Sequence, residues 1–259
     1  MLGRTRSWPS LKREARLVFV VGSPRSGTTF LGTSLGAQSG LIDLGEVKPL
    51  KAMIPQLVQL PEREAAVRFR RTLEVVRQLG LAGHLRGVEQ TPETSFVLAA
   101  ALRAYAGASA VHIVRDGRDV VCSLLERGWL GADRTGEDDA GLAYGAHPRF
   151  WVEPERADEF RHASEARRAA WAWRRYVEGA RAAPERTLEI RYEELVSEPQ
   201  QVAGRTAAYL ELQEEPLEAS LSKAFDRSVG RYKKDLTRAQ LADVEEEAGA
   251  LLNELGYFN

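Results

Sequence analysis

The sequence predicts an α/β fold in which a P-loop-like parallel sheet is flanked by helices on both faces. Two almost continuously apolar runs rich in β-branched residues, Leu17–Val21 and Ala110–Val114, are typical of strands buried on both faces. Helical patterns separate the two runs, and a glycine-containing turn follows the first at once. Because ligands of such sheets bind at the carboxyl ends of the strands, we expect the functional site there.

Composition indicates a globular chain without a global anion-binding field. The 259 residues are 44% hydrophobic and 28% charged, and we expect one domain over residues 1–259. Since 36 Lys and Arg balance 37 Asp and Glu, neither nucleic acid nor an anionic membrane is an expected partner. Cys122 stands alone and no apolar run reaches the roughly 18 residues of a membrane span. We therefore expect a cytoplasmic protein, of undetermined oligomeric state.

Weaker patterns complete the predicted sheet and mark one long loop. Further strands are expected around Val88 and over Thr187–Ile190. Thr91-Pro92-Glu93 combines a cap, a proline at the first helical position and an acid, which predicts a helix running towards Tyr105. Residues 129–160 have no clean period, and we expect them to form a lid or acceptor loop.

Capping residues predict where two later helices begin. Asp116 and Asp119 are candidate caps for the helix that follows the second apolar run. Thr237 and Gln240 have the spacing of a capping box, ahead of an amphipathic final helix. Helices and strands therefore alternate along the chain, as a parallel sheet requires.

The turn after the first strand carries the clearest chemical motif. Gly22 and Gly27 have the G-x-x-x-x-G spacing of a nucleotide P-loop, whose backbone N–H groups and helix start bind phosphate. Thr28 stands where a Walker A motif has lysine, and Arg25 supplies positive charge instead. The motif therefore favours a nucleotide with a single 5′ anionic group over ATP or GTP hydrolysis.

A second anion site is predicted at the next strong strand. Arg115 lies at the carboxyl end of this strand, and Ser123 lies two turns into the following helix, so both can converge on another phosphate. Asp116, Arg118 and Asp119 are assigned to capping and local ion pairs. Two separated phosphate sites fit a 3′,5′-bisphosphorylated nucleoside.

At this point the sequence resembles the sulfotransferase family that uses 3′-phosphoadenosine 5′-phosphosulfate (PAPS), most of all the bacterial branch related to tyrosylprotein and heparan sulfate sulfotransferases. The resemblance implies transfer of a sulfuryl group to a hydroxyl, less often an amine, of a small-molecule, saccharide or natural-product acceptor, without a metal. It extends over nearly the whole chain and is carried by Pro24–Thr29, Gly45-Glu46, Glu89–Pro92, Arg115–Ser123, Arg191–Leu195 and Val229–Lys233.

The resemblance also implies contacts with the donor. Tyr192 is either an adenine-side contact or a core tyrosine, and Arg231 and Lys233 lie either in a loop that closes over the cofactor or in a solvated basic turn. The residues implied to hold the 5′-phosphosulfate are Arg25, Ser26, Gly27, Thr28 and Thr29, and those implied to hold the 3′-phosphate are Arg115 and Ser123.

Two acids compete for the role of general base. Glu46 matches the Gly-Glu pair of the tyrosylprotein-type enzymes and Glu89 matches the heparan-type segment, and we favour Glu46. Burial in an apolar-walled cleft raises the pKa of a glutamate towards neutrality, which suits a base. Gln90 departs from the lysine common in the family, so Arg25 is expected to assist the leaving oxygen as well.

Two other functions remain open. One is a P-loop kinase of small molecules, against which Thr28 argues because it occupies the lysine position. The other is a catalytically weak nucleotide-binding member of the family, which Gln90 suggests. His112 is expected in the core, and His147 fits no motif. Aromatic residues available for an acceptor pocket are Trp129, Phe150, Trp151, Trp171 and Trp173, of which Trp171 and Trp173 are more simply core residues.

Overall fold

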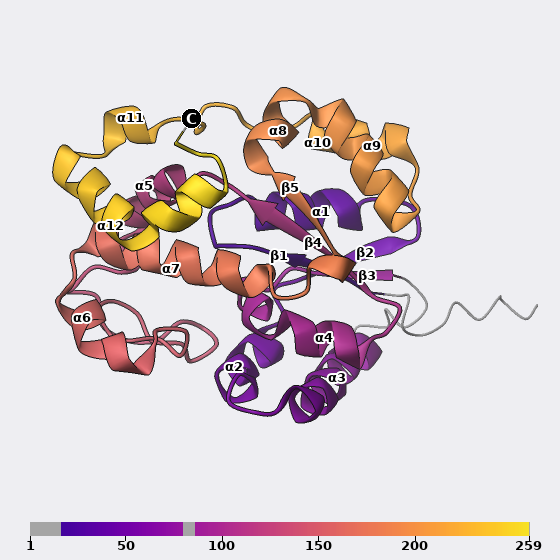
Figure 1. Ribbon diagram of the computed structural model, residues 1–259. Helices are drawn as coiled ribbons and strands as arrows, with labels where there is room; N and C mark the ends of the chain where they lie inside the picture. The colour runs from indigo at the N-terminus through magenta and orange to yellow at the C-terminus, as the bar shows by residue number, and fades with distance from the viewer. Residues whose placement is uncertain (1–16, 80–85, 259) are drawn as a thin grey trace, which may run out of the picture.

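A computed structural model describes residues 17–79 and 86–258, which build a parallel sheet with helices on both faces (Figure 1). The strand order is β2-β3-β1-β4-β5, so β1 lies between β3 and β4 at the centre. All four strand pairs are parallel, with Val18 opposite Val88 and Val20 opposite Val111. The strands are β1 (Leu17–Val21), β2 (Leu41–Gly45), β3 (Arg86–Glu89), β4 (Ser109–Val114) and β5 (Thr187–Arg191). Both the strong and the weak strand predictions are confirmed.

The central strand β1 is buried on both faces because its side chains enter two different cores. Leu17, Phe19 and Val21 belong to one hydrophobic cluster, whereas Val18 and Val20 belong to another. The alternation follows from the two-residue period of a strand. A continuous apolar run is therefore what this position in the sheet requires.

Each core is closed by its own set of helices, which gives the layers seen in Figure 1. The Val18 face packs against α1 (Thr28–Gly36), α8 (Tyr192–Ser197), α9 (Pro199–Leu210) and α10 (Glu214–Leu221). The Phe19 face packs against α2 (Lys48–Leu57), α3 (Glu62–Leu79) and α4 (Leu98–Ala104). A third core joins the end of β4 to α5 (Gly117–Arg127), α6 (Ala157–His162), α7 (Glu165–Ala180) and α12 (Arg238–Glu254). Within the described ranges, no helix has both the length and the apolarity needed to cross a membrane.

Two of the predicted helix starts are confirmed. The Asp116 side chain accepts a hydrogen bond of 2.9 Å from the Arg118 N–H at the start of α5. Thr237 and Gln240 form the complete capping box of α12, with side-chain to backbone bonds in both directions. These local bonds satisfy N–H groups that no helical carbonyl reaches.

The helix start predicted at Thr91-Pro92-Glu93 is confirmed in position, but the Thr91 side chain does not cap it, and the expectation that Asp119 caps α5 was wrong. The helix expected from Thr91 begins as the 3₁₀ helix η2 (Pro92–Val97) and becomes α4 only at Leu98. Instead of capping, the Thr91 hydroxyl accepts a 2.9 Å hydrogen bond from the Val47 N–H. Asp119 does not cap α5 either, because its carboxylate accepts from the Gly230 and Tyr232 N–H groups. Both side chains therefore accept hydrogen bonds from N–H groups that lie far away in the sequence.

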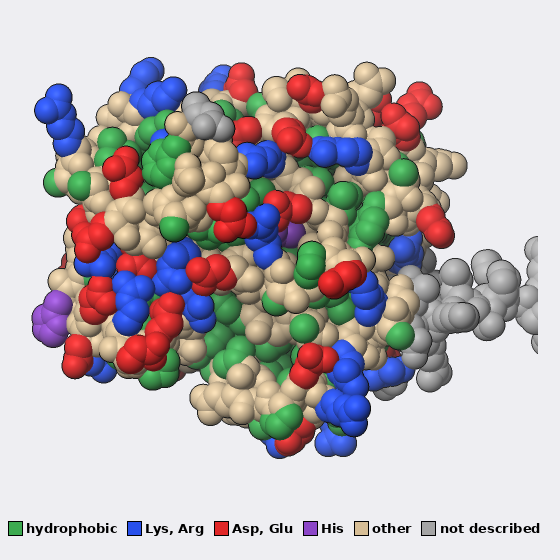
Figure 2. Space-filling view, in the orientation of Figure 1, with side chains coloured by type: hydrophobic (Ala, Val, Ile, Leu, Met, Phe, Trp, Pro, Cys, Tyr) green, Lys and Arg blue, Asp and Glu red, His purple; other side chains and the backbone are tan. Residues whose placement is uncertain are grey.

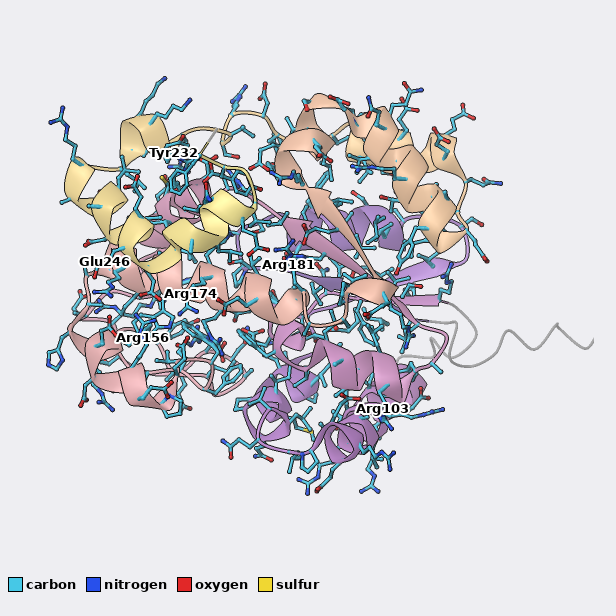
Figure 3. The ribbon with its side chains drawn as sticks, in the orientation of Figure 1. Arg103, Arg156, Arg174, Arg181, Tyr232 and Glu246 are labelled. Carbon is cyan, nitrogen blue, oxygen red and sulfur yellow. The ribbon has the colours of Figure 1, made fainter. Side chains whose placement is uncertain are left out.

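The expected acceptor loop at residues 129–160 is irregular over 128–153, where the only regular pairing is an isolated bridge between Glu137 and Ala143. Its two ends are tied to α7 and α12. Arg168, 3% exposed, donates a 2.8 Å hydrogen bond to the Leu130 carbonyl oxygen. At the other end, α12 Glu247 pairs with Arg156 and Arg174, whose side chains are labelled in Figure 3. Acidic and basic side chains are interspersed over this part of the surface (Figure 2).

The short helices η3 (Pro154–Arg156), η4 (Pro184–Arg186) and α11 (Tyr232–Asp235) complete the described elements.

Candidate functional site

All the sequence motifs except Val229–Lys233 meet at one edge of the sheet, because each lies at the carboxyl end of a parallel strand. The glycine turn of residues 22–27 follows β1, and Glu46 follows β2. Gln90 follows β3, Arg115 follows β4 and Tyr192 follows β5. Segments far apart in the chain are therefore gathered at the place where the sequence analysis expects the site.

The turn after β1 is a close-fitting cradle at the start of α1. A Cβ at Gly22 (φ 147°) would lie 2.5 Å from the Ile113 carbonyl oxygen, and one at Gly27 (φ 100°) would lie 2.9 Å from the Tyr192 ring. No side chain caps α1 at Gly27. The Ser26 hydroxyl is buried and has no hydrogen-bond partner among the described residues. The turn therefore presents free N–H and O–H donors to an anion.

Beside this turn, Arg25, Arg115 and Ser123 form a connected basic group. The Arg25 Nε donates to the Ser123 hydroxyl at 2.9 Å, and Arg115 donates to the carbonyl oxygens of Arg25, at 3.3 Å, and Ser228. The buried Nε of Arg115 has no partner among the described residues. Burial, together with the neighbouring Arg127 and Arg115, lowers the pKa of Arg25. An anion between these guanidinium groups would relieve their repulsion.

A cleft of about 200 Å³ opens over the cradle and the basic group. The Tyr192 ring lies 4.7 Å from the Arg115 guanidinium carbon, and its hydroxyl donates a 2.8 Å hydrogen bond to the Phe225 carbonyl oxygen. Tyr192 is thus a core residue and a wall of the cleft at once. Sequence reasoning missed Phe30 and Phe225, which no local motif marks. The cleft is lined by Arg25, Gly27, Thr28, Thr29, Phe30, Arg115, Tyr192 and Phe225.

Arg231 and Lys233 do not line this cleft. Arg231 forms ion pairs with Glu126 and Asp235, the latter at 2.7 Å, and Lys233 is exposed. The segment before them reaches the cleft through backbone groups instead, since the Ser228 carbonyl oxygen accepts from Arg115.

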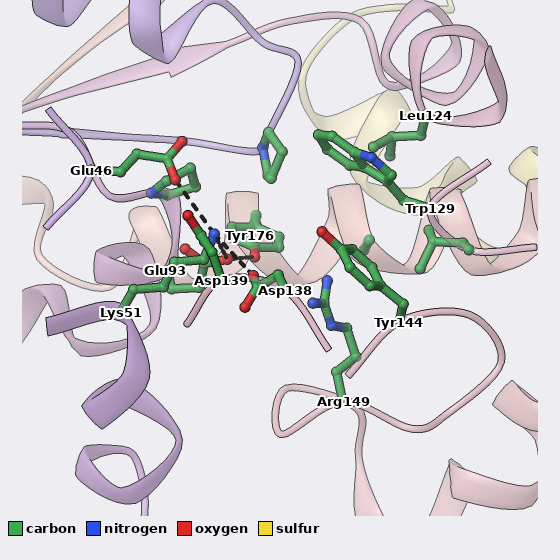
Figure 4. Close-up of a pocket in the computed structure, with 14 residues that line it drawn as sticks. Glu46, Lys51, Glu93, Leu124, Trp129, Asp138, Asp139, Tyr144, Arg149 and Tyr176 are labelled. Carbon is green, nitrogen blue, oxygen red and sulfur yellow. Dashed lines mark hydrogen bonds and ion pairs between the residues drawn. The ribbon is translucent and has the colours of Figure 1, made fainter. Parts of the chain in front are cut away.

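A second cavity of about 250 Å³ adjoins the glycine turn at Pro24 (Figure 4). Glu46 lies on its wall with a side chain that is 45% exposed. Lys51 lies 3.4 Å from Glu46, 3.7 Å from Glu93 and 3.2 Å from Asp138. Although burial opposes it, these three acids raise the pKa of Lys51. The other lining residues are Pro24, Pro92, Leu124, Trp129, Leu130, Asp139, Tyr144, Arg149, Ala172 and Tyr176.

The sequence analysis did not single out Lys51, Glu93, Asp138, Tyr144 or Arg149. They come from α2, η2 and the irregular loop, and no short motif joins them. Burial raises the pKa of Glu93, whose carboxylate accepts a 2.9 Å hydrogen bond from the Tyr176 hydroxyl. Of these five residues, the sequence analysis mentioned only Glu93, and only as an acid at the start of a helix.

Glu89 and Gln90 lie behind the cavity walls. Glu89 is fully buried, accepting from the Thr91 N–H at 2.7 Å and the Thr94 hydroxyl at 3.0 Å, and burial raises its pKa to about 7. Gln90 donates to Asp43 at 3.0 Å beneath α1. Neither residue lines the cleft or the cavity.

The remaining candidates separate into core and surface. Trp129 lines the cavity, whereas Trp151, Trp171 and Trp173 are buried in the third core. His112 is fully buried on β4, with Nδ1 3.0 Å from a Glu189 carboxylate oxygen, which confirms the core assignment. His147 is exposed and outside the cavity. Over residues 17–79 and 86–258, no three His, Cys, Asp or Glu side chains gather as metal ligands would.

Solved structures similar to this one are sulfotransferases. The sulfotransferase domain from the curacin biosynthetic pathway is 17% identical, with 90% of this chain and 96% of that chain covered at a TM-score of 0.56. The sulfotransferase domain of the Synechococcus PCC 7002 olefin synthase is 16% identical. The alignment covers 91% of this chain and 94% of that chain, with a TM-score of 0.52. Mouse sulfotransferase SULT7A1, solved in complex with PAP, is 13% identical. The alignment covers 92% of this chain and 85% of that chain, with a TM-score of 0.54. At these identities the likeness shows the fold.

The family itself is shown by the sequence. Among curated proteins no sequence matches this chain. The model of the sulfotransferase family, however, matches residues 18–216, which is more than half of the chain and spans all five strands. The chain therefore belongs to the sulfotransferase family.

Proposed function

We propose that this protein transfers the sulfuryl group of PAPS to a hydroxyl, less often an amine, of a small-molecule, saccharide or natural-product acceptor, with Glu46 as general base. The observation that carries the proposal is the pairing of two sites. A basic cleft built on Arg25, Arg115 and Ser123 adjoins, through Pro24, a cavity that contains a carboxylate. Donor and acceptor would meet at this junction.

The donor fits the cleft at both of its anionic ends. The 5′-phosphosulfate would receive hydrogen bonds from the N–H groups at the start of α1, from the unpartnered Ser26 hydroxyl and from Thr28 and Thr29. The 3′-phosphate would lie on Arg115 and Ser123, where the Arg115 Nε lacks a partner. Arg25, bonded to Ser123, lies close to both ends.

The adenine would lie among aromatic rings. Tyr192, Phe30 and Phe225 line the same cleft as the basic group, and flat aromatic faces suit a nucleobase. Arg231 and Lys233 would contribute only if the segment of residues 225–233 closes further over the donor. Its backbone is already tied to Arg115 and Tyr192.

Bound PAPS supplies a sulfuryl group on a stable leaving phosphate. The acceptor hydroxyl oxygen forms its bond to sulfur as the bond between sulfur and the 5′-phosphate oxygen breaks, and that oxygen keeps the electron pair. Glu46 takes the hydroxyl proton, and Lys51 holds the carboxylate at the cavity wall. Arg25 and the α1 N–H groups stabilise the negative charge on the departing PAP.

Glu46 is preferred to Glu89 because of access. The Glu46 side chain is 45% exposed and lines the cavity, whereas both oxygens of the fully buried Glu89 accept hydrogen bonds from its own turn. Gln90 is bonded to Asp43, so Arg25 is the side chain left to assist the leaving oxygen.

Ligand-induced thermal stabilisation tests the donor. PAP without Mg²⁺ should stabilise the protein by about 2.7 kcal/mol at 100 times its dissociation constant, and radiolabelled PAPS should transfer sulfate in the presence of EDTA. Stabilisation by ATP that requires Mg²⁺ would instead indicate a small-molecule kinase. Stabilisation by PAP without transfer to any acceptor would indicate a nucleotide-binding member that lacks activity.

A further inference from the structure

Asp119 is a fully buried acid in the first turn of α5, and it lines neither the cleft nor the cavity. Each of its carboxylate oxygens accepts a backbone hydrogen bond, Oδ2 from the Gly230 N–H at 2.7 Å and Oδ1 from the Tyr232 N–H at 3.0 Å. The two N–H groups lie 111 and 113 residues further along the chain. Asp119 therefore ties the segment of residues 225–233 to the helix that follows β4.

The same carboxylate lies next to the residue proposed to hold the 3′-phosphate. Asp119 Oδ2 is 3.9 Å from a guanidinium nitrogen of Arg115, and both side chains are almost completely buried. At this distance the attraction is between charges and is not a hydrogen bond, and burial keeps water and salt from screening it. Asp119 therefore favours one placement of the Arg115 guanidinium, on the side of α5.

The segment that Asp119 holds also holds Arg115. The Arg115 guanidinium donates to the carbonyl oxygen of Ser228, which lies two residues before Gly230. Figure 1 shows α11, which this segment enters, beside α5. Asp119 thus holds the segment, the segment holds Arg115, and Arg115 lies next to Asp119. Displacing any one of the three removes contacts from the other two.

The burial of Asp119 makes these contacts necessary. An ionised carboxylate is unfavourable away from water unless hydrogen-bond donors and cations take the place of the water. Burial raises the pKa of Asp119, while the N–H groups of Tyr232 and Gly230 and the charge of Arg115 act against that rise. The docked segment and the placed Arg115 therefore stabilise the same buried charge.

We propose that Asp119 is a positioning residue for the donor, which fixes the Arg115 guanidinium and docks the segment of residues 225–233, so that a 3′-phosphate on Arg115 tightens the docking of that segment. This inference rests on the proposed function, and it goes further by linking recognition of the 3′-phosphate to one segment of the chain. Asp119 itself does not touch the nucleotide.

The variant Asp119→Asn tests the link, because the amide keeps the size of the side chain but has one acceptor oxygen and no charge. Isothermal titration gives the dissociation constants of PAP and of AMP, which lacks the 3′-phosphate. The preference for PAP should fall by about threefold to tenfold, as expected for loss of one hydrogen bond, with the larger change in the affinity for PAP. Removal of a negative charge would by itself strengthen binding of PAP, the more highly charged nucleotide, so the expected fall has the opposite sign.

Glu126→Gln is the matched control. Glu126 lies on the same helix and also holds the segment, through its ion pair with Arg231, and among the described residues its carboxylate accepts hydrogen bonds from Arg231 alone. This variant should therefore keep the preference for PAP. If it lowers the preference as much as Asp119→Asn does, docking of the segment alone explains the effect and the role of Asp119 in placing Arg115 is wrong.

Hydrogen exchange of the wild type decides the question even if Asp119→Asn does not fold. Peptides that contain Gly230 and Tyr232 should exchange at least about fivefold more slowly with saturating PAP than with saturating AMP. Equal exchange with the two nucleotides overturns the proposal, as does an unchanged preference or an equal loss of both affinities in a folded Asp119→Asn protein. A wild type that binds AMP as tightly as PAP would refute the donor assignment instead, which keeps the two failures distinguishable.

Discussion

Replacing Arg115 by methionine should abolish the preference for a 3′-phosphorylated nucleotide. Arg115 is 5% exposed at the end of β4, and its guanidinium lies 4.7 Å from the centre of the Tyr192 ring. Methionine keeps much of the side-chain volume on that ring but removes the charge and every donor. The change therefore removes the proposed phosphate contact, the two carbonyl bonds to Arg25 and Ser228, and the 3.9 Å ion pair with the buried Asp119.

The expected magnitude follows from the burial of this group. A hydrogen bond between charged partners contributes about 1.5–3 kcal/mol, and the buried setting of Arg115 places it towards the upper end. The affinity for PAP should fall by about tenfold to a hundredfold. The affinity for AMP, which lacks the 3′-phosphate, should change by less than about threefold. Ser123→Ala removes a neutral donor, so its effect on PAP should be smaller, about twofold to tenfold.

Isothermal titration of PAP and AMP against each variant measures the ratio directly. Arg149→Met, an equivalent substitution in the neighbouring cavity, is the control and should leave both nucleotide affinities unchanged. Circular dichroism reports whether loss of the two carbonyl bonds loosens the fold. Equal loss of PAP and AMP affinity in a folded Arg115→Met protein would refute the assignment of the 3′-phosphate.

Three further predictions concern the base, the buried acid and the glycine turn. Glu46→Gln should lower kcat by about 10²–10⁴-fold and leave PAP affinity intact, measured by radiolabel transfer and titration; a near-normal kcat would remove Glu46 from the mechanism. Glu89, whose pKa burial raises to about 7, holds its proton more tightly in the folded than in the unfolded chain, so stability should fall by up to about 3 kcal/mol as pH rises from about 4.5 to 7. Denaturant melts of Glu89→Gln should lack that part of the slope, and an unchanged slope would contradict it. Gly27→Ala should cost about 1–3 kcal/mol of stability and weaken PAP binding, because its backbone φ is 100° and the new Cβ would meet the Tyr192 ring; a melting temperature equal to that of the wild type would show that the turn adapts.

Local patterns predicted much of the fold. The strands Leu17–Val21 and Ala110–Val114 were readable because a strand buried on both faces must be apolar throughout. The capping box of Thr237 and Gln240 was readable because both partners lie within one turn. Thr91 does precede its helix, but its side chain accepts a hydrogen bond from the Val47 N–H instead of capping that helix. Asp119 does not cap α5, because its carboxylate accepts hydrogen bonds from the distant Gly230 and Tyr232 N–H groups.

For the site, the sequence by itself predicted the residues of the proposed donor side. Arg25, Arg115 and Ser123 belong to recognisable segments, and parallel strands bring the ends of those segments to one edge of the sheet. Only the tertiary structure showed the cavity that we propose for the acceptor. Lys51 and Arg149 lie almost a hundred residues apart, in an amphipathic helix and an irregular loop, and each alone resembles an ordinary surface cation. The two side chains come together only because these segments pack around one cavity. Such packing produces no fixed spacing between the residues that a sequence motif could show.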